Sequence, residues 1–266
     1  MRVKVGAHTL ALSNLDKELY PDGTTKAEII DYYTRVSSAL LPHLQERPLT
    51  RVRFPDGADR PGFFEKNAPL GKPSWVRVNK RDFIVCDDLP TLVWLANLAA
   101  LELHTHQWRE GSAPDRVVFD LDPGDGAGLD ECRAVALALR GRLSADGLES
   151  FPKTSGKKGM QVTVHAPCDA RAIAAEFAKA APKMITDQMD KRLRRGKVFI
   201  DWSQNADFKT TICVYSLRAG PIPTVSAPLM WDEVESGDFA SDDFTLHTMP
   251  DRIDQLGDLH AGLLTS

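Results

Sequence analysis

The spacing of apolar residues predicts several helices along the chain. Ile29, Tyr33, Val36 and Leu40 recur every three or four positions within residues 13–45, which is typical of a helix with one buried face. The stretch TKAE that begins at Thr25 has the pattern of a capping box, in which threonine and glutamate side chains satisfy the first free amides of a helix. Further helices are expected over residues 90–106, 128–148 and 170–190.

Short apolar runs that lie between turn residues predict strands. Residues 48–90 contain several such runs among prolines and glycines, and longer ones occur in VVFDLD, MQVTVHAP and VFIDWS. Strands and helices alternate, but not as a regular βαβ repeat. A mixed α+β fold is therefore favoured over a doubly wound sheet.

Composition narrows the class of protein. A chain of 266 residues with 42% hydrophobic and 26% charged residues can bury a large core. It contains no apolar run of about 18 residues, and its first residues lack the pattern of a signal peptide, so we expect a cytoplasmic protein. The four cysteines are scattered without a CxxC pair, which predicts reduced core cysteines rather than zinc ligands or disulfides.

The net charge of −4 hides an asymmetry between two parts of the chain. Residues 229–266 carry nine acidic residues and one arginine, whereas the other residues carry 28 acidic and 32 basic ones. An acidic C-terminal segment on a mildly basic body is compatible with a polyanionic partner, because the local field matters more than the total charge.

Two carboxylates end the strand VVFDLDPG. Asp120 and Asp122 are two residues apart and therefore point to the same face of a strand, where they repel each other unless a proton or cation lies between them. The run VFID ends in Asp201 after a similar apolar stretch. Three aspartates at adjacent strand ends can hold two divalent cations. The alternatives are an acidic strand terminus for the pair and a turn cap for Asp201.

A lysine- and glycine-rich turn lies between these carboxylates in the sequence. In KTSGKKG, the glycines let backbone amides approach an anion, while Ser155 and Lys158 supply a hydroxyl donor and a positive charge. The spacing is not that of a Walker A motif. The turn is a candidate phosphate loop, and a solvated turn is the alternative.

The order of these motifs resembles the archaeo-eukaryotic primase superfamily and, within it, the polymerase domain of bacterial ligase D, a repair enzyme of non-homologous end joining. The resemblance runs nearly end to end, through NLDKELYPDGTTKAEIIDYYTRV, RPLTRVRFPDG, GFFEKN, PSWVRV, LELHTHQWR, VVFDLDPG, KTSGKKGM, KVFIDWSQN, KTTICVYSLR and PTVSAP. It implies one primase-like α+β domain over residues 1–266. Its catalytic core would be a mixed or antiparallel sheet flanked by helices, with an N-terminal lobe that binds DNA ends and approximate lobes of 1–110 and 111–266.

The resemblance also implies roles for individual residues. Asp120, Asp122 and Asp201 would hold two divalent cations, Mn²⁺ or Mg²⁺. The nucleoside triphosphate would be bound by Arg53, His104, Ser155, Lys158, Gln161, Gln204, Lys209 and Arg218. DNA would be bound by Lys17 and Lys26 at a 5′-phosphate, by Phe63 and Phe64 stacking on template bases, and by Arg194 and Arg195 in a basic run.

Two positions depart from the pattern of the family. Gln161 stands where the family usually has a histidine, and Val52 replaces a basic residue in a segment like TRKRW. A glutamine can donate a hydrogen bond but cannot carry charge, so the affinity for the triphosphate or its pH dependence is expected to differ. Ligase and nuclease motifs are absent, which leaves a stand-alone relative or an excised domain.

The resemblance implies a template-directed nucleotidyltransferase that fills gaps or extends broken ends carrying a 5′-phosphate, with a preference for ribonucleotides. Expected partners are DNA, ribo- or deoxyribonucleotides, an end-binding Ku protein and a separate DNA ligase, in the bacterial cytoplasm at the nucleoid. The alternatives are a DNA-end-bridging protein with a vestigial polymerase and a primase that needs no primer. A phosphatase is disfavoured because DLDPG lacks the threonine of the DxDxT pattern.

Overall fold

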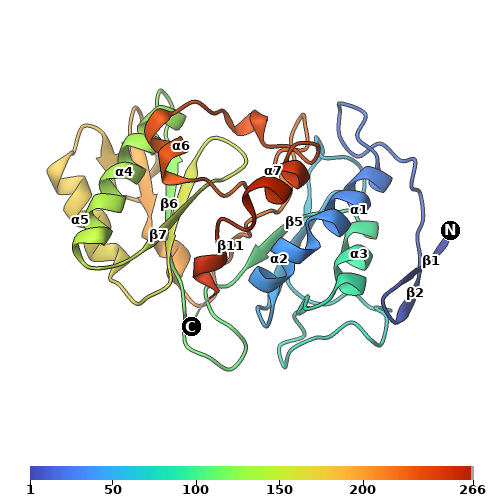
Figure 1. Cartoon of the computed structure of the whole chain (residues 1–266). Coiled ribbons are helices and arrows are strands. Elements are labelled where there is room, and N and C mark those ends of the chain that lie inside the picture. Colours follow the sequence, from blue (N-terminus) through green and yellow to red (C-terminus); the bar gives the residue numbers. More distant parts are fainter. Residues whose placement is uncertain (265–266) are drawn as a thin grey trace.

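The computed structural model describes residues 1–264 and has a mixed α+β architecture built around two sheets (Figure 1). The five-stranded sheet has the order β7-β8-β6-β10-β9. Its strands are β7 (Ser150–Thr154), β8 (Met160–Val164), β6 (Val117–Pro123), β10 (Val198–Asp201) and β9 (Ile185–Thr186). All pairs are antiparallel except β9 with β10.

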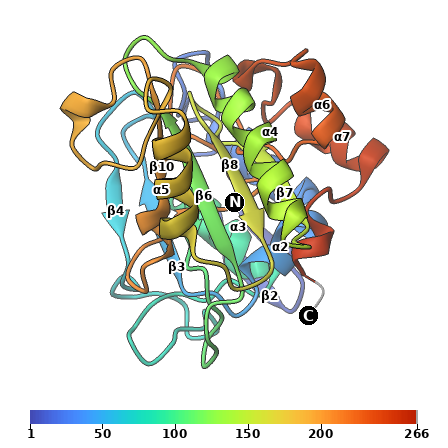
Figure 2. The same cartoon turned by 90° about the vertical axis from the view of Figure 1, so that its left-hand side faces the viewer.

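Two helices cover one face of this sheet. Helices α4 (Leu129–Ala145) and α5 (Ala170–Ala180) lie over β6, β8 and β10 (Figure 2). Phe119, Leu121 and Ile200 are fully buried, and strand alternation puts them on the face opposite to the aspartates of β6 and β10. The carboxylate face of the sheet is thus left open for a site.

The four-stranded sheet has the order β11-β5-β3-β4 and is antiparallel throughout. Its strands are β11 (Thr211–Ile212), β5 (Ala100–Thr105), β3 (Leu49–Arg53) and β4 (Phe63–Glu65). Helices α1 (Lys26–Arg35), α2 (Ser37–Leu44) and α3 (Leu89–Asn97) gather beside it, and β1 (Arg2–Val5) pairs with β2 (His8–Ala11) at the N-terminal end (Figure 1). Because β11 comes late in the sequence, this sheet is not made from residues 1–110 alone, and the two-lobe division stays a prediction.

The remaining helical elements are short. They are α6 (Trp231–Ser236), α7 (Met249–Leu256) and the 3₁₀ turns η1 (Lys191–Leu193), η2 (Trp202–Asn205), η3 (Ser241–Asp243) and η4 (Ala261–Leu263). No helix within residues 1–264 has the length and apolar composition needed to cross a membrane. Of the four free cysteines, Cys86, Cys132 and Cys213 are buried, as predicted for core cysteines, whereas Cys168 is half-buried.

The helix predicted over residues 13–45 is wrong in its extent. Residues 13–25 are not helical, and the rest divides into α1 and α2 at Val36. The capping box is confirmed: the Glu28 amide donates to Thr25 Oγ1, and the Thr25 amide donates to Glu28 Oε2 at 2.8 Å. The helix predicted over 170–190 is also too long, since α5 ends at Ala180, two residues before Pro182.

The helix predicted over residues 90–106 is wrong in its second half. Helix α3 ends at Asn97, Ala99 takes a left-handed conformation with φ of 57°, and the chain reverses into strand β5. Strand β5 pairs with both β3 and β11, so its backbone groups are satisfied by a sheet rather than a helix. Glu102 and His104 therefore share one strand face.

The acidic C-terminal segment is docked on the body of the protein. Arg35 Nη2 lies 3.3 Å from Asp251 Oδ1, and Arg140 Nη1 lies 2.5 Å from Glu235 Oε1. Asp258 accepts hydrogen bonds from His43 Nε2 and the Tyr215 hydroxyl, both at 2.8 Å. The segment thus uses much of its negative charge on partners within the fold.

The capping box of α1 gives a first prediction. Thr25→Ala is expected to lower the free energy of unfolding by about 1 kcal/mol, because the first turn of α1 loses its hydroxyl acceptor. Thr25→Ser, which keeps the hydroxyl, is the matched control. Urea unfolding followed by circular dichroism measures both, and equal stability of the alanine variant and the unaltered protein would contradict the assigned cap.

Buried histidines give a prediction for pH. Burial lowers the pKa of His260 to about 3, with its ring beside Pro152 and near His43, Lys153 and Asp258. The unfolded chain binds a proton near pH 6.5. The contribution of neutral His260 to the stability of the fold is therefore fully present above about pH 6.5. It decreases as the pH falls toward the pKa of His260 in the folded protein.

As the pH falls from about 7 to 5, His260 should lower the free energy of unfolding by up to about 2 kcal/mol. Urea titrations across this range should show a smaller pH slope for His260→Gln than for the unaltered protein. Equal slopes in the two proteins would show that His260 does not carry the effect.

Candidate functional site

A pocket of about 950 Å³ lies between the two sheets. Strand β6 contributes Asp120 and Asp122, whereas β5 and β11 of the other sheet contribute His104 and Ile212. The loop of residues 155–159, between β7 and β8, and the segment of residues 218–224 complete the lining. The pocket therefore depends on both sheets and on segments far apart in the sequence.

The three aspartates meet at the paired strands β6 and β10. Asp120 lies directly opposite Asp201 in the antiparallel register, and Asp122 is two residues further along the same face. Asp201 is buried, and its carboxylate accepts hydrogen bonds from Ser203 Oγ at 2.6 Å and Gln204 Nε2 at 2.8 Å. The juxtaposition that the sequence predicts is present.

The charges of these carboxylates are poorly compensated. Burial and, next in size, the charge of the neighbouring Asp122 together raise the pKa of Asp120 to about 7. Burial and Asp201 likewise raise the pKa of Asp122, while the charges of Arg194 and Arg218 act against this. Among residues 1–264, no lysine, arginine or histidine forms an ion pair with any of the three. A cation in the pocket would relieve this repulsion.

The donor set suits hard divalent cations such as Mg²⁺ and Mn²⁺, which prefer carboxylate oxygens. The uncompensated charge at Asp120 and Asp122 is the observation that supports such a site. Within the described residues, however, no group of three or more His, Cys, Asp or Glu side chains is arranged to hold an ion on its own. Asp201 is instead engaged by its own turn.

Gln161 supports the carboxylates rather than the phosphate loop. It lies opposite Asp120 in the β6–β8 register, is buried, and donates from Nε2 to Asp120 Oδ1 at 2.9 Å. Its Oε1 has no hydrogen-bond partner within residues 1–264. The glutamine that replaces the family's usual histidine therefore contacts Asp120, one of the proposed cation ligands.

The loop of residues 155–159 has tight local geometry. Ser155 Oγ accepts hydrogen bonds from the amides of Lys157 and Gly159, both at 3.2 Å. Gly156 has a φ of 71°, and a Cβ there would lie 2.5 Å from Arg218 Cγ. Lys158 lines the pocket without a partner among the described residues, so its charge is available to an anion.

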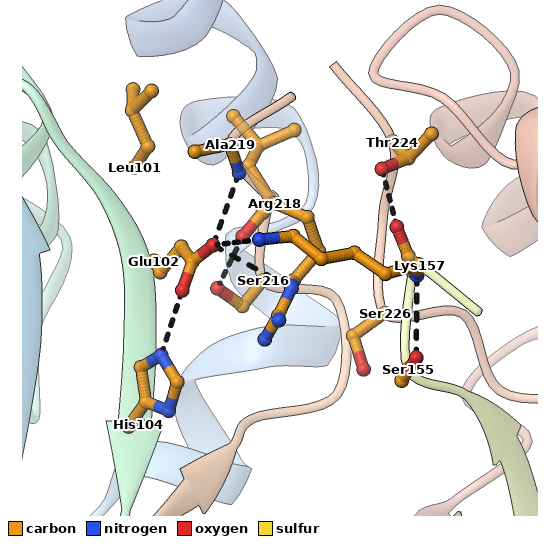
Figure 3. A network of polar contacts seen from close by, with 12 residues as sticks. Leu101, Glu102, His104, Ser155, Lys157, Ser216, Arg218, Ala219, Thr224 and Ser226 are labelled. Carbon is orange, nitrogen blue, oxygen red and sulfur yellow. Dashed lines mark hydrogen bonds and ion pairs between the residues drawn. The ribbon is translucent and has the colours of Figure 1, made fainter. Parts of the chain in front are cut away.

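Glu102 links the loop to the other wall of the pocket (Figure 3). Its carboxylate lies 3.0 Å from His104 Nε2, 3.4 Å from Lys157 Nζ and 3.5 Å from Arg218 Nε. Burial acts against ionisation, but the hydrogen bond from His104 and the charge of Arg218 lower the pKa of Glu102 to about 2. Sequence reasoning missed this residue, whose only signal was the Glu-x-His alternation in LELH.

A second pocket of about 230 Å³ brings Lys17 and Lys26 together with Arg53. Lys17 Nζ donates to the Pro55 carbonyl at 2.6 Å, and Lys26 Nζ donates to that of Asn97 at 3.1 Å. Burial and the charge of Lys17 lower the pKa of Lys26. The convergence of the two lysines agrees with the prediction, but Arg53 lies here and does not line the nucleotide-pocket candidate.

Strand β4 carries two exposed phenylalanines at the edge of its sheet. The exposed fractions are 52% for Phe63 and 58% for Phe64, so neither side chain belongs to the buried core. They point to opposite faces, since Phe63 pairs with Arg53 and the Phe64 ring lies 6.3 Å from the ring of His104. The Phe64 ring therefore contacts His104, a residue that lines the large pocket.

The basic run before β10 packs against the turn after β6. The Gly124 amide donates to the Lys197 carbonyl at 2.8 Å, and a Cβ on Gly124 would lie 1.9 Å from the Arg194 carbonyl. Arg194 lines the large pocket and lies 3.7 Å from the centre of the Phe199 ring, whereas Arg195 is exposed. Lys209 lies one residue outside the lining, next to Thr210.

Comparisons with known proteins agree with this geometry. The family model described as LigD, primase-polymerase domain, matches residues 25–260. The multifunctional non-homologous end joining DNA repair protein LigD of Mycobacterium tuberculosis is 42% identical over 255 residues, covering 85% of this chain and 33% of the relative. The bifunctional LigD of Bacillus subtilis is 35% identical over 263 residues, covering 93% and 43%.

The chain thus spans about a third to two fifths of the length of these relatives. A solved structure, the polymerase domain from Mycobacterium tuberculosis ligase D in complex with DNA, superposes with a TM-score of 0.89 at 40% identity. The match covers 96% of this chain and 98% of that one. The resemblance on which the sequence analysis relied is confirmed, and the chain belongs to the LigD primase-polymerase domain family.

Proposed function

We propose that this chain is a template-directed nucleotidyltransferase that fills gaps and extends broken DNA ends in non-homologous end joining. The observation that carries the proposal is the large pocket, in which the face of β6 with Asp120 and Asp122 lies beside the loop of residues 155–159. Nucleotidyl transfer needs a carboxylate cluster and a triphosphate site at one place. The names of the relatives support the repair context.

Each side of the pocket has a separate task in this mechanism. Asp120, Asp122 and Asp201 would hold the divalent cations, which supply charge neutralisation for the attacking and leaving oxygens when bound. Lys158, Arg218 and Ser155 would bind the triphosphate through positive charge and hydrogen-bond donors. Gln161 and Gln204 keep the carboxylates oriented through their amide groups. Catalysis then rests mainly on positioning and electrostatics.

DNA would be bound along the edge of the four-stranded sheet. Lys17 and Lys26, together with Arg53, form a compact positive pocket that suits a 5′-phosphate. Phe63 and Phe64 are exposed aromatics on which template bases can stack, a contact worth roughly 1–3 kcal/mol per base. Arg195 is free for the backbone of the duplex.

The cellular setting is part of the same proposal. Since the chain spans only part of the curated relatives, the DNA ligase step would be supplied by another domain or another protein. An end-binding protein of the Ku type would deliver the broken ends, in the bacterial cytoplasm at the nucleoid. Ribonucleotides are the proposed preferred substrate.

The direct test is extension of a gapped duplex with a 5′-phosphate on the downstream strand. The assay tests every template base with every ribo- and deoxyribonucleotide, in the presence of Mg²⁺ or of Mn²⁺. Addition of the complementary nucleotide is expected, with faster addition of ribonucleotides. Tight DNA binding without any nucleotide addition would support the end-bridging alternative, and synthesis on a single-stranded template without a primer would support the primase.

Substitution of the aspartates tests the catalytic assignment. Asp120→Ala, Asp122→Ala and Asp201→Ala should each reduce nucleotide addition by roughly a hundredfold or more, because the cation ligands are lost. DNA binding should persist, since the basic pocket is separate. Asp130→Ala, at an exposed carboxylate on α4, is the control. Extension by any of the three at nearly the unaltered rate would refute the assignment.

Substitution of the two lysines tests the DNA-end site. The double variant Lys17→Ala, Lys26→Ala should lose its preference for 5′-phosphorylated over 5′-hydroxyl DNA, because the pocket keeps only Arg53. Extension of a recessed template without a downstream strand should change little. Lys179→Ala with Lys183→Ala, at exposed positions of another face, is the control. Continued discrimination by the double variant in a binding assay would place phosphate recognition elsewhere.

A further inference from the structure

A buried carboxylate directly behind the wall of the nucleotide-pocket candidate has no role in the mechanism above: it contacts lining residues of the pocket without lining it itself. Glu102 lies on β5, and the exposed fraction of its side chain is only 8%. Its contacts come from three segments: His104 on the same strand, Ala219 and Arg218 after β11, and Lys157 in the loop of residues 155–159 (Figure 3). A single acidic group therefore joins both walls of the pocket.

The contacts define how the neighbouring groups are oriented. Because Glu102 is ionised and can only accept, His104 Nε2 must be the donor in their 3.0 Å hydrogen bond. This leaves His104 Nδ1 without a partner among the described residues, in a side chain that lines the pocket. The Ala219 amide donates to Glu102 Oε1 at 3.1 Å and fixes the backbone next to Arg218.

Two cations approach the same oxygen from different sides. Lys157 Nζ and Arg218 Nε lie 3.4 and 3.5 Å from Glu102 Oε1, and both residues line the pocket. The side chain of Lys157 is 47% exposed, so without Glu102 it would sample many rotamers. The carboxylate keeps both positive groups at the pocket wall before any anion is bound.

We propose that Glu102 is a positioning residue that holds His104, Lys157 and Arg218 in place for the triphosphate. The inference rests on the proposed function and adds Lys157 to the groups that contact phosphate. The positioning role and the net charge of the pocket predict opposite effects of removing the Glu102 charge on triphosphate affinity. Removal of a negative charge beside an anion site should strengthen binding if only the net field mattered, whereas loss of positioning should weaken it.

The experiment measures binding of a fluorescent nucleoside triphosphate in the presence of Mn²⁺ to the full chain. Glu102→Gln keeps the shape of the side chain and removes its charge. Its Kd is expected to rise roughly tenfold or more, because charge-assisted contacts to three groups are weakened. Glu149→Gln, at an exposed position before β7, is the matched control and should bind as the unaltered protein does.

Two further measurements separate positioning from a merely structural role. In extension assays, Glu102→Gln should raise the KM for the nucleotide more than it lowers kcat, while discrimination between 5′-phosphate and 5′-hydroxyl ends stays unchanged. Lys157→Met alters a half-exposed side chain, so the fold should be retained, and the Kd should also rise. Equal or tighter nucleotide binding by either variant would overturn the proposal.

The measurements distinguish a failure of the positioning role from a failure of the proposed function. If the unaltered protein binds nucleotide, Glu102→Gln binds it more weakly, and neither extends DNA, then the polymerase assignment fails and the positioning role stands. If the unaltered protein extends DNA and Glu102→Gln has the same Kd and KM, then the positioning role fails and the polymerase assignment stands.

Discussion

Repulsion between carboxylates on the paired strands β6 and β10 is the constraint on which the pocket depends. Asp120 faces Asp201 across the strands, and Asp122 is adjacent on the same face, so burial and mutual charge raise the pKa of Asp120 to about 7. Surrounding groups reduce the cost only in part. Gln161 and Gln204 each donate one hydrogen bond. Within residues 1–264, Arg194 and Arg218 act from the pocket wall without forming an ion pair with any of the three aspartates. Such an arrangement is unfavourable for the fold alone and is characteristic of a site that binds cations.

The walls of the pocket are held together by contacts between distant segments. The Tyr20 hydroxyl donates to the Arg218 carbonyl at 3.0 Å, and the Tyr32 hydroxyl donates to that of Tyr215 at 2.7 Å. The Tyr33 hydroxyl donates to Leu101 and accepts from the Leu217 amide. Through these tyrosines, the N-terminal part of the chain holds residues 215–218, the segment that follows β11 and includes Arg218. The positions of Glu102, His104 and Arg218 are therefore consequences of packing between the N-terminal helices and the C-terminal half.

Local patterns predicted the parts of the site that depend on local geometry. Two-residue spacing placed Asp120 and Asp122 on one face, and the capping box placed Lys26 beside the start of α1. Strand β5 was missed because its apolar run continues that of α3, and only the left-handed turn at Ala99 and the pairing with β3 separate them. Arg53 was assigned to the nucleotide and Arg194 to DNA, whereas Arg53 lies in the pocket with Lys17 and Lys26 and Arg194 lines the large pocket. Sheet register and loop packing, rather than neighbouring residues, decide where these side chains lie.

The central claim is that one nucleotide site is formed jointly by the two sheets. Calorimetric titration with a non-hydrolysable nucleoside triphosphate and Mn²⁺ tests it most directly, with one variant from each sheet. Asp122→Ala alters the five-stranded sheet, and His104→Ala alters the four-stranded sheet. The account predicts binding of one nucleotide per chain, which depends on the cation and is weakened by either substitution. Tight binding that neither substitution changes would contradict it, because the nucleotide would then lie outside this pocket.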